Sequence, residues 1–445
     1  MQRGPGNDRQ TVRITERRGN SVTDHLQDAP CDDRQMFEAL KELRRQTAGK
    51  GARATIGRLF GAAKKRLLRP LRRRGAYEKY RAFVDAGYKL VKLSNPDRIG
   101  HLCLEIDCLL KETIMAGGDT KKFVLADIGA GFANRHVIDY FRRYLTVMDD
   151  DSAGHFIRSY GDPAGAQIET HPYAVAMRTT ARAYDIYARW GDRPPLFEAS
   201  EKDRAAALAF LMSQGMPEDS WFVCLHARSG GYNQIDEAVH AFRSVDISSY
   251  SLAIDEIAAR GGWCVRMGDP SMAPMKPRPQ TIDFATHPQK SPQLDIALAA
   301  TCRFLLGSGS GLFNLAEMFG RPCAIAHMAP IACGYAFAPT DISIFQHLAD
   351  TSGRVVPYAE ILSREWASYR SREAFEQAGL RCVPNSPEEI GALTIEMFDR
   401  LEGRFVATDD DRRRQEDLRS LFREGHYAFR AQSSIGRDFL RATMP

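Results

Sequence analysis

Residues 303–322 read RFLLGSGSGLFNLAEMFGRP, and this stretch decides the fold class. A short apolar run is followed by a turn of alternating glycine and serine, and then by a segment with the apolar spacing of a helix. Gly320 and Pro322 end this segment and lead into the next apolar run, PCAIAHM. Units of strand, turn and helix build sheets of parallel strands that helices cover on both faces.

The same kind of unit recurs on both sides of this stretch. From about residue 216 to 385, the apolar runs WFVCLHAR, WCVRMGDP and TIDFA alternate with helical segments. An earlier series, from about 85 to 215, contains YKLVKLS and KFVLADIG. The sequence therefore predicts an α/β protein with two Rossmann-like domains, residues 85–215 and 216–385, whose parallel sheets face each other across a cleft.

The two ends of the chain differ from these series. Residues 1–30 are polar and glycine-rich, which predicts a disordered tail, and residues 386–445 are predicted to form C-terminal helices, with Ser386 as the first N-cap. Residues 31–84 are predicted to form a basic amphipathic helical extension, because residues 50–74 contain no Asp or Glu and carry apolar side chains at helical spacing. Such a helix could contact an anionic membrane peripherally or pack as a solvated helix on the first domain, and the sequence leaves both open.

Composition is typical of a soluble globular protein. The 445 residues are 44% hydrophobic and 26% charged, with a formal net charge of +5. The nine cysteines lie mostly in apolar runs, as expected of reduced thiols, and the N-terminus lacks the apolar core of a signal peptide. We therefore expect a cytoplasmic protein, held on the inner face of the cell membrane if the basic extension binds there. No base-reading motif accompanies the basic charge, so we expect no nucleic-acid partner.

The strand ends of the second series carry candidate ligands, because parallel sheets bind ligands at the carboxyl ends of their strands. His226 and Arg228 share one side of a strand end, and a bidentate guanidinium suits a diphosphate. A structural ion pair is the alternative for Arg228. Arg266 and Asp269 end the next strand, where they could clamp a phosphate and meet a ribose or base, or could pair with each other.

The glycine and serine turn is the strongest candidate for an anion site. It consists of Ser308, Gly309, Ser310 and Gly311. Its backbone N–H groups precede a helix whose positive dipole end would face a bound anion, and the two serine hydroxyls add donors. Glu317, farther along this helix, could face a ribose, with a solvated surface position as the alternative.

Residues 125–132, LADIGAGF, suggest a different chemistry. A strand that ends in a glycine-rich turn before a helix is how methyltransferases bind S-adenosylmethionine, and the acidic residues 149–151 lie where a ribose-binding acid is expected. A tight connection would need the same glycines. A methyltransferase that depends on S-adenosylmethionine therefore stays an alternative, although it leaves the second series without a role.

Several motifs together resemble a known family. RIGHL, LHAR, GGWCVRMGDPSM, the pair Asn134 and Arg135, and the run DIALAATCRFLLGSGSGLFNLAEMFGRPCAIAHMAP resemble a bacterial family of predicted glycosyltransferases from polysaccharide and surface-glycan gene clusters, over about residues 88 to 400. The HxR strand and the later SxS turn are more distantly similar to the fucosyltransferase superfamily. That superfamily would place an aspartate at the position of Gly231.

The resemblance implies the GT-B fold and the transfer of a hexose or deoxyhexose from a nucleotide-sugar donor to a glycan or other surface-polysaccharide acceptor. It places Arg228 and the 308–311 turn at the diphosphate of the donor. It also places LADIGAGF at the second strand of the acceptor domain, with its glycines in a connecting loop.

The same resemblance implies an acceptor side on the first domain. Its residues would be Arg98, Gly100, His101, Asn134 and Arg135. His101 could act as the general base toward a sugar hydroxyl, or could be structural, and Glu105 and Asp107 are weaker candidates. Together with Arg228, His101 is the predicted catalytic residue.

Two acidic triplets, residues 149–151 and 409–411, could bind a divalent cation. The second is followed by RRRQED, which is typical of a solvated charged surface. Enzymes of the resembled fold leave charge neutralisation to side chains and helix dipoles. We therefore predict a metal-independent enzyme with no cofactor besides its nucleotide-sugar co-substrate. A non-catalytic protein that binds a nucleotide or glycan is a further alternative.

Overall fold

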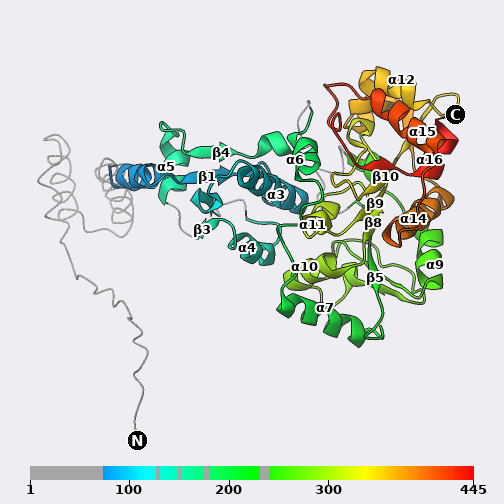
Figure 1. Cartoon of the computed structure of the whole chain (residues 1–445), viewed down its shortest axis with the longest axis horizontal. Helices are drawn as coiled ribbons and strands as arrows, with labels where there is room; N and C mark the ends of the chain where they lie inside the picture. Colours follow the sequence, from blue (N-terminus) through cyan, green and yellow to red (C-terminus); the bar gives the residue numbers. More distant parts are fainter. Residues whose placement is uncertain (1–73, 127–130, 149–151, 175–179, 231–239, 445) are drawn as a thin grey trace, which may run out of the picture. The chain divides into compact units, whose positions relative to one another are not determined.

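A seven-stranded parallel sheet contains the GSGSG turn quoted above. In the computed structural model of the chain, β8 (Leu305–Ser308) lies at its centre, in the strand order β13-β10-β9-β8-β5-β6-β7 (Figure 1). The other strands are β5 (Phe222–His226), β6 (Trp263–Arg266), β7 (Thr281–Asp283), β9 (Cys323–Met328), β10 (Ile342–Phe345) and β13 (Ser434–Ile435).

Helices cover this sheet, and the burial of its strands follows from that cover. Every residue of β5 and β9 is buried, as in parallel sheets that are packed on both faces. Among the helices, α7 packs against α10 and α9 packs against α14. Their bounds are α7 (Glu201–Ser213), α9 (Ser251–Ala259), α10 (Pro292–Thr301), α11 (Leu312–Met318) and α14 (Pro387–Leu401).

A second parallel sheet precedes it in the sequence. Its order is β3-β2-β1-β4, and each pairing is parallel. The strands are β1 (Lys89–Lys92), β2 (Phe123–Ala126), β3 (Thr146–Met148) and β4 (Gln167–Glu169). The helices of this series are α3 (Ile99–Met115), α4 (His136–Phe141), α5 (Ser152–Tyr160) and α6 (Arg182–Trp190). The prediction of an α/β protein with two parallel sheets is confirmed.

Two glycines bring the two series into contact, because α3 packs against α11 at their first turns. A Cβ atom on Gly100 would lie 2.5 Å from Gly311 Cα, and a Cβ atom on Gly311 would lie 2.9 Å from Gly100 Cα. Real Cβ atoms do not approach backbone that closely, so this packing requires glycine on both helices. The N-terminal end of α3 is therefore fixed beside the GSGSG turn.

Residues 386–444 are mainly helical and contain one short strand, and two further strands precede them. α14 is followed by α15 (Asp409–Ser420) and α16 (Arg437–Thr443), and Ser386 caps α14 by accepting a hydrogen bond from Glu389 N at 3.2 Å. β13, only two residues long, extends the seven-stranded sheet, and β11 (His347–Asp350) pairs with β12 (Leu380–Val383) in an antiparallel ribbon. The sequence analysis predicted neither feature.

Short elements complete the chain. They are α12 (Tyr358–Ser363), α13 (Arg372–Gln377) and the 3-10 turns η2 (Thr120–Lys122), η3 (His171–Tyr173), η4 (Ala241–Arg243), η5 (Ile247–Tyr250), η6 (Phe284–Thr286), η7 (Ile331–Cys333) and η8 (Glu365–Ser368). In the described ranges, no helix combines the length and apolar character needed to cross a bilayer.

The structure describes residues 74–126, 131–148, 152–174, 180–230 and 240–444. Phe83–Pro445 form one compact unit. Of the other unit, Met1–Ala82, only residues 74–82 are described, and these are helical. The predicted tail and most of the predicted basic extension, including residues 50–73, lie outside the described residues. The predicted domain boundaries stay predictions, although the strands of the first sheet all fall before residue 215.

Candidate functional site

A cavity of about 480 Å³ opens where α3 and α11 meet. From the first series, the predicted residues that line it are Arg98, Gly100, His101 and Asn134. From the second series, the predicted residues that line it are His226, Arg228, Asp269, Gly309, Ser310 and Gly311. The fold therefore brings most of the predicted acceptor-side and donor-side residues to one cavity. Arg135, Arg266, Ser308 and Glu317 do not line it.

Basic side chains outnumber acidic ones around this cavity. Among the described lining residues, the basic ones are Arg98, Arg228, Arg243, Lys290 and Arg370, and the acidic ones are Asp269 and Asp295. Part of the wall is apolar and aromatic, with Phe242, Phe313 and Phe337. Apolar walls weaken the screening of charge by water, so this arrangement favours an anionic ligand that also has an apolar or planar part.

The main chain of Arg228 is tied to the GSGSG turn. Its backbone N–H donates to the oxygen of the buried Ser308 hydroxyl at 2.8 Å. The guanidinium donates from Nη1 to Ser244 Oγ at 2.7 Å and to the carbonyl of His240 at 3.2 Å. Residues 240–244 therefore position this guanidinium at the cavity.

The turn offers less than the sequence suggested. Ser308 Oγ accepts from Arg228 N and does not line the cavity, whereas Ser310 lines it and its Oγ accepts from Leu312 N at 3.4 Å. α11 is seven residues long, so the helix dipole predicted behind the anion is weak. Gly309, Ser310 and Gly311 line the cavity, and the missing Cβ atoms of the two glycines make room for Met328 and for the backbone of Gly100.

Two arginines at the cavity were missed by the sequence analysis. Arg243 ends η4 and donates from Nη2 to the carbonyl of Gly309, so it contacts the turn directly. Arg370 follows η8, with its guanidinium 4.9 Å from the ring centre of Tyr427. Its carbonyl lies 3.1 Å from His240 Nδ1. Both lie in segments without a strand-end pattern, so the sequence carried no signal for them.

His101 is backed by a buried carboxylate. Its Nδ1 lies 2.7 Å from Glu105 Oε1, one helical turn along α3, and Glu105 is fully buried. Glu105 also accepts from Ser94 N at 3.1 Å and from the hydroxyl of Thr170. Burial alone would raise the pKa of Glu105, but the hydrogen bonds from its partners outweigh that effect and leave the pKa below its usual value.

This pair sets the chemistry of the imidazole. Because Glu105 is ionised, the ring donates from Nδ1 and leaves a lone pair on Nε2, which forms no hydrogen bond with any described residue. A carboxylate behind the ring stabilises the charge that the ring acquires when Nε2 accepts a proton. His101 therefore has the surroundings of a general base, and Glu105, a weaker catalytic candidate in the sequence, has the position of a group that orients it.

His226 lines the same cavity in a different state. Its Nδ1 lies 3.1 Å from the carbonyl of Met267, and a carbonyl can only accept, so Nδ1 carries the proton. Burial and the charges of Arg266, Arg228 and Lys290 lower the pKa of His226 to about 4, against a smaller opposing effect of the Met267 carbonyl. The ring is neutral near pH 7.

Arg266 and Glu317 lie in the interior, away from their predicted positions. Arg266 is buried, and its Nη1 lies 3.2 Å from Asp283 Oδ2 and donates to the carbonyl of Ala273 at 2.8 Å. The ion-pair partner of Arg266 is therefore Asp283 and not Asp269. Arg266 does not line the cavity, but its charge acts on His226, which does. The prediction erred because a strand end fixes the position of a residue but not the direction of a long side chain.

Glu317 is neither on the surface nor at the cavity. It is buried, and it accepts from Phe337 N and Asn314 Nδ2, each at 3.0 Å. Burial and the neighbouring Asp341 raise the pKa of Glu317 well above its usual value. Burial also raises the pKa of Asp341, to about 6. The two carboxyls form a buried pair beneath the turn.

Asn134 has a structural role at the rim of the cavity. Its Oδ1 accepts from His136 N at 2.8 Å at the start of α4, and its Nδ2 donates to the carbonyl of Pro292 at 2.9 Å. It therefore links the first series to α10. Arg135 lies outside the cavity lining.

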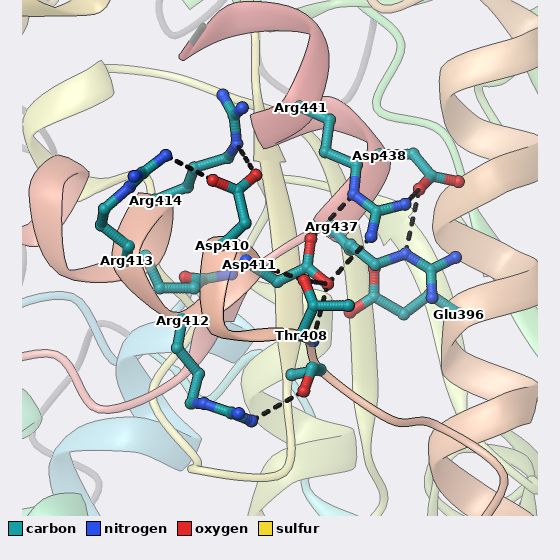
Figure 2. A network of polar contacts seen from close by, with 12 residues as sticks. Glu396, Thr408, Asp410, Asp411, Arg412, Arg413, Arg414, Arg437, Asp438 and Arg441 are labelled. Carbon is teal, nitrogen blue, oxygen red and sulfur yellow. Dashed lines mark hydrogen bonds and ion pairs between the residues drawn. The ribbon is translucent and has the colours of Figure 1, made fainter.

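The remaining motifs fall elsewhere. Residues 127–130 of LADIGAGF and the triplet 149–151 lie outside the described residues. The triplet 409–411 begins α15, where Thr408 and Asp411 form a capping box and arginines pair with the carboxylates (Figure 2). Within the described ranges, no group of three or more His, Cys, Asp or Glu side chains is arranged to hold a metal ion. Metal independence stays a prediction.

Comparisons with known proteins give only distant likenesses. No protein-family model and no curated protein matches the chain. Among solved structures, the glycosyl transferase family 9 protein of Veillonella parvula DSM 2008 is 13% identical with a TM-score of 0.35, over 54% of this chain and 80% of that one. E. coli ADP-heptose LPS heptosyltransferase II is 11% identical with a TM-score of 0.33, over 54% of this chain and 86% of that one.

The iron-containing dodecameric glycosyltransferase TibC of enterotoxigenic E. coli H10407 is also similar, at 11% identity and a TM-score of 0.31, over 57% of this chain and 61% of that one. All three are glycosyltransferases. With TM-scores this low, the likenesses carry no argument about function, which has to rest on the cavity. The likeness to the fucosyltransferase superfamily stays an expectation from the sequence.

Proposed function

We propose that the protein is a glycosyltransferase that takes a sugar from a nucleotide-sugar donor bound in the cavity. One observation supports this most. A single cavity brings together basic side chains suited to a diphosphate and a histidine backed by a buried carboxylate. Together they match two needs of the reaction: groups that bind the leaving diphosphate and a base for the acceptor.

The leaving group would be stabilised by the guanidinium side of the cavity. When the bond between the anomeric carbon and the diphosphate oxygen breaks, negative charge develops on that oxygen. Arg228, Arg243 and Arg370 line this side, and Arg228 is held in place by Ser244 and His240. Donors that are already oriented stabilise developing charge without reorganising, which is a large part of such catalysis.

The acceptor would enter beside α3. Its hydroxyl proton passes to His101 Nε2 while its oxygen forms the new bond to the anomeric carbon, and Glu105 stabilises the resulting imidazolium. The products are the glycosylated acceptor and a nucleoside diphosphate, and the proton stays on His101 until it is released to water. A hexose or deoxyhexose as the transferred sugar and a glycan or surface-polysaccharide acceptor follow from the sequence resemblance and belong to the proposal. So do a cytoplasmic location and peripheral membrane contact through residues 50–74.

A thermal-shift panel tests the proposal. The ligands are GDP, UDP, dTDP, CMP and S-adenosylhomocysteine, each with and without EDTA, because a ligand that binds the folded state raises the melting temperature. The proposal predicts stabilisation by one of the nucleotides, unaffected by EDTA, and release of that nucleotide from its sugar conjugate when acceptor is present. Stabilisation by S-adenosylhomocysteine alone would instead support a methyltransferase. Donor binding without transfer or hydrolysis would indicate a non-catalytic binding protein.

A further inference from the structure

His101 and His226 both line the cavity, but they differ in the group that lies at Nδ1 of the ring. His101 has the carboxylate of Glu105 at its Nδ1, whereas His226 has the carbonyl of Met267. The ring of His226 makes no other hydrogen bond with the described residues, so its Nε2 is a lone pair that is left for a ligand. Burial and the cations Arg266, Arg228 and Lys290 lower the pKa of His226 to about 4 and so keep this nitrogen unprotonated.

Two carboxylates, which are hydrogen-bond acceptors, lie at the same end of the cavity as these cations. Asp269 follows Met267 by two residues and lines the cavity, with its Oδ1 taken by Ser271 N at 2.9 Å. Lys290 and Asp295 form an ion pair at the same end. The pKa of Asp295 is raised, mainly by burial, and Lys290 opposes this rise. The charge of Asp269 contributes to the rise, which shows that the two carboxyls lie near each other. This end thus differs from the guanidinium end.

A diphosphate would leave the acceptors at this end of the cavity without a donor. Its ionised oxygens only accept hydrogen bonds, and placing them against an imidazole lone pair or a carboxylate brings two acceptors together. A hydroxyl group can donate to Nε2 and to a carboxylate and can accept from Lys290. The chemistry of this corner therefore fits a group that carries several hydroxyls.

We propose that His226 is a specificity residue, which accepts a hydrogen bond from a hydroxyl of the transferred sugar, and that Asp269 and the Lys290–Asp295 pair complete a hydroxyl-binding subsite. This inference rests on the proposed function. It also separates the two imidazoles: His101 takes up a proton during the reaction, whereas His226 only holds the sugar.

The test compares two substitutions that divide the functions of the ring. His226→Asn keeps an amide near the Nδ1 position for the Met267 carbonyl and removes the acceptor at Nε2. His226→Gln keeps an amide that can present an oxygen near the Nε2 position. Calorimetric titrations would use UDP, GDP, dTDP and ADP, each paired with its hexose conjugate and with deoxy forms of that conjugate. His171→Asn, at an exposed position, is the control, and melting temperatures without ligand check the fold.

In the wild-type protein, one deoxy form should bind at least about tenfold more weakly than its parent conjugate, because a site built for a hydroxyl rejects the analogue without it. In His226→Asn this difference should vanish while the affinity for the free diphosphate stays the same, and His226→Gln should restore part of it. If the substitution weakened diphosphate and conjugate equally, the inference would be wrong and the proposed function would stand. If no diphosphate bound the wild-type protein, the proposed function would fail and the inference with it.

Discussion

Arginines gather in two regions of this protein, and the two regions differ in how their charge is balanced. At α15 and α16, five arginines each meet a carboxylate (Figure 2). They are Arg412, Arg413, Arg414, Arg437 and Arg441. The cavity also has five basic residues, but only Asp269 and Asp295 as acidic residues among its described lining.

The surroundings differ as well. In the α15 region, the side chains of Arg412 and Arg413 are 59% and 65% exposed, so water screens their charge and each pair contributes little to stability. The basic residues of the cavity lie on a concave surface with aromatic walls, where screening is weaker. An arginine-rich stretch such as DDDRRRQED is therefore no sign of a binding site, whereas basic residues from distant segments that meet in one cavity are.

The largest expected effect is a loss of turnover when the charge of a cavity arginine is removed. Arg228→Met removes the charge and keeps most of the length of the side chain, and turnover of the nucleotide sugar should fall by about 100-fold or more, because an oriented donor to the leaving group is lost. The matched control, Arg412→Met, removes a paired surface arginine and should leave turnover unchanged. Product release measured for both variants, with circular dichroism to check the fold, decides the matter. An Arg228→Met enzyme with full activity would contradict the proposed role.

A smaller loss is expected when the support of the base is changed. Glu105→Gln removes the charge behind His101 but keeps a hydrogen-bonding side chain, and kcat should fall by about 10- to 100-fold, within the contribution of general base catalysis. The dissociation constant of the nucleoside diphosphate should stay unchanged, because Glu105 does not line the cavity and contacts Ser94, His101 and Thr170. Equal losses in kcat and in diphosphate affinity would show that Glu105 acts only on the fold.

The junction that forms the cavity can be tested through its glycines. Gly100→Ala places a methyl group 2.5 Å from Gly311 Cα, so the backbones of α3 and α11 must separate. Such overpacking should lower the free energy of unfolding by about 1–3 kcal/mol, measured by urea denaturation. Gly425→Ala is the control, because a Cβ atom there meets nothing within 4 Å. If both variants were equally stable, the close approach of the two helices would be wrong.

The smallest effect concerns the buried carboxyl pair and depends on pH. The pKa of Glu317 is raised in the folded protein, so folding takes up a proton at any pH between the unfolded and the folded pKa, and this group stabilises the fold less as pH rises through that range. Glu317→Gln mimics the protonated form and should remove that loss. Between pH 5 and pH 8, the unfolding free energy of the variant should therefore fall less than that of the wild-type protein. The difference should grow by about 1 kcal/mol for each pH unit between the unfolded and the folded pKa of Glu317. Parallel pH profiles would show that Glu317 is ionised.

The sequence was informative where burial decides structure. Runs such as WFVCLH and PCAIAHM became β5 and β9, because a strand that is apolar on both faces is removed from water when helices cover both faces of its sheet. β13 was missed, since two residues carry no periodicity and its pairing with β10 depends on the whole fold. The direction of long side chains was not predictable either, as Arg266 shows by turning to Asp283.

The site shows the same division. Arg228 could be found because it stands at the end of a strand, and His101 because its motif RIGHL resembles that of a known family. Arg243 and Arg370 belong to turns whose position is set by tertiary contacts, so nothing local marked them. The role of Glu105 depends on Ser94 and Thr170, which come from different segments.

A crystal structure with the nucleoside diphosphate that stabilises the protein tests the central claim most directly. We predict that the diphosphate lies in the cavity, with oxygens within about 2.7–3.2 Å of the Arg228 guanidinium and against the backbone of residues 309–311. A diphosphate bound outside this cavity, or a cavity that binds none while S-adenosylhomocysteine occupies residues 127–130, would contradict the account.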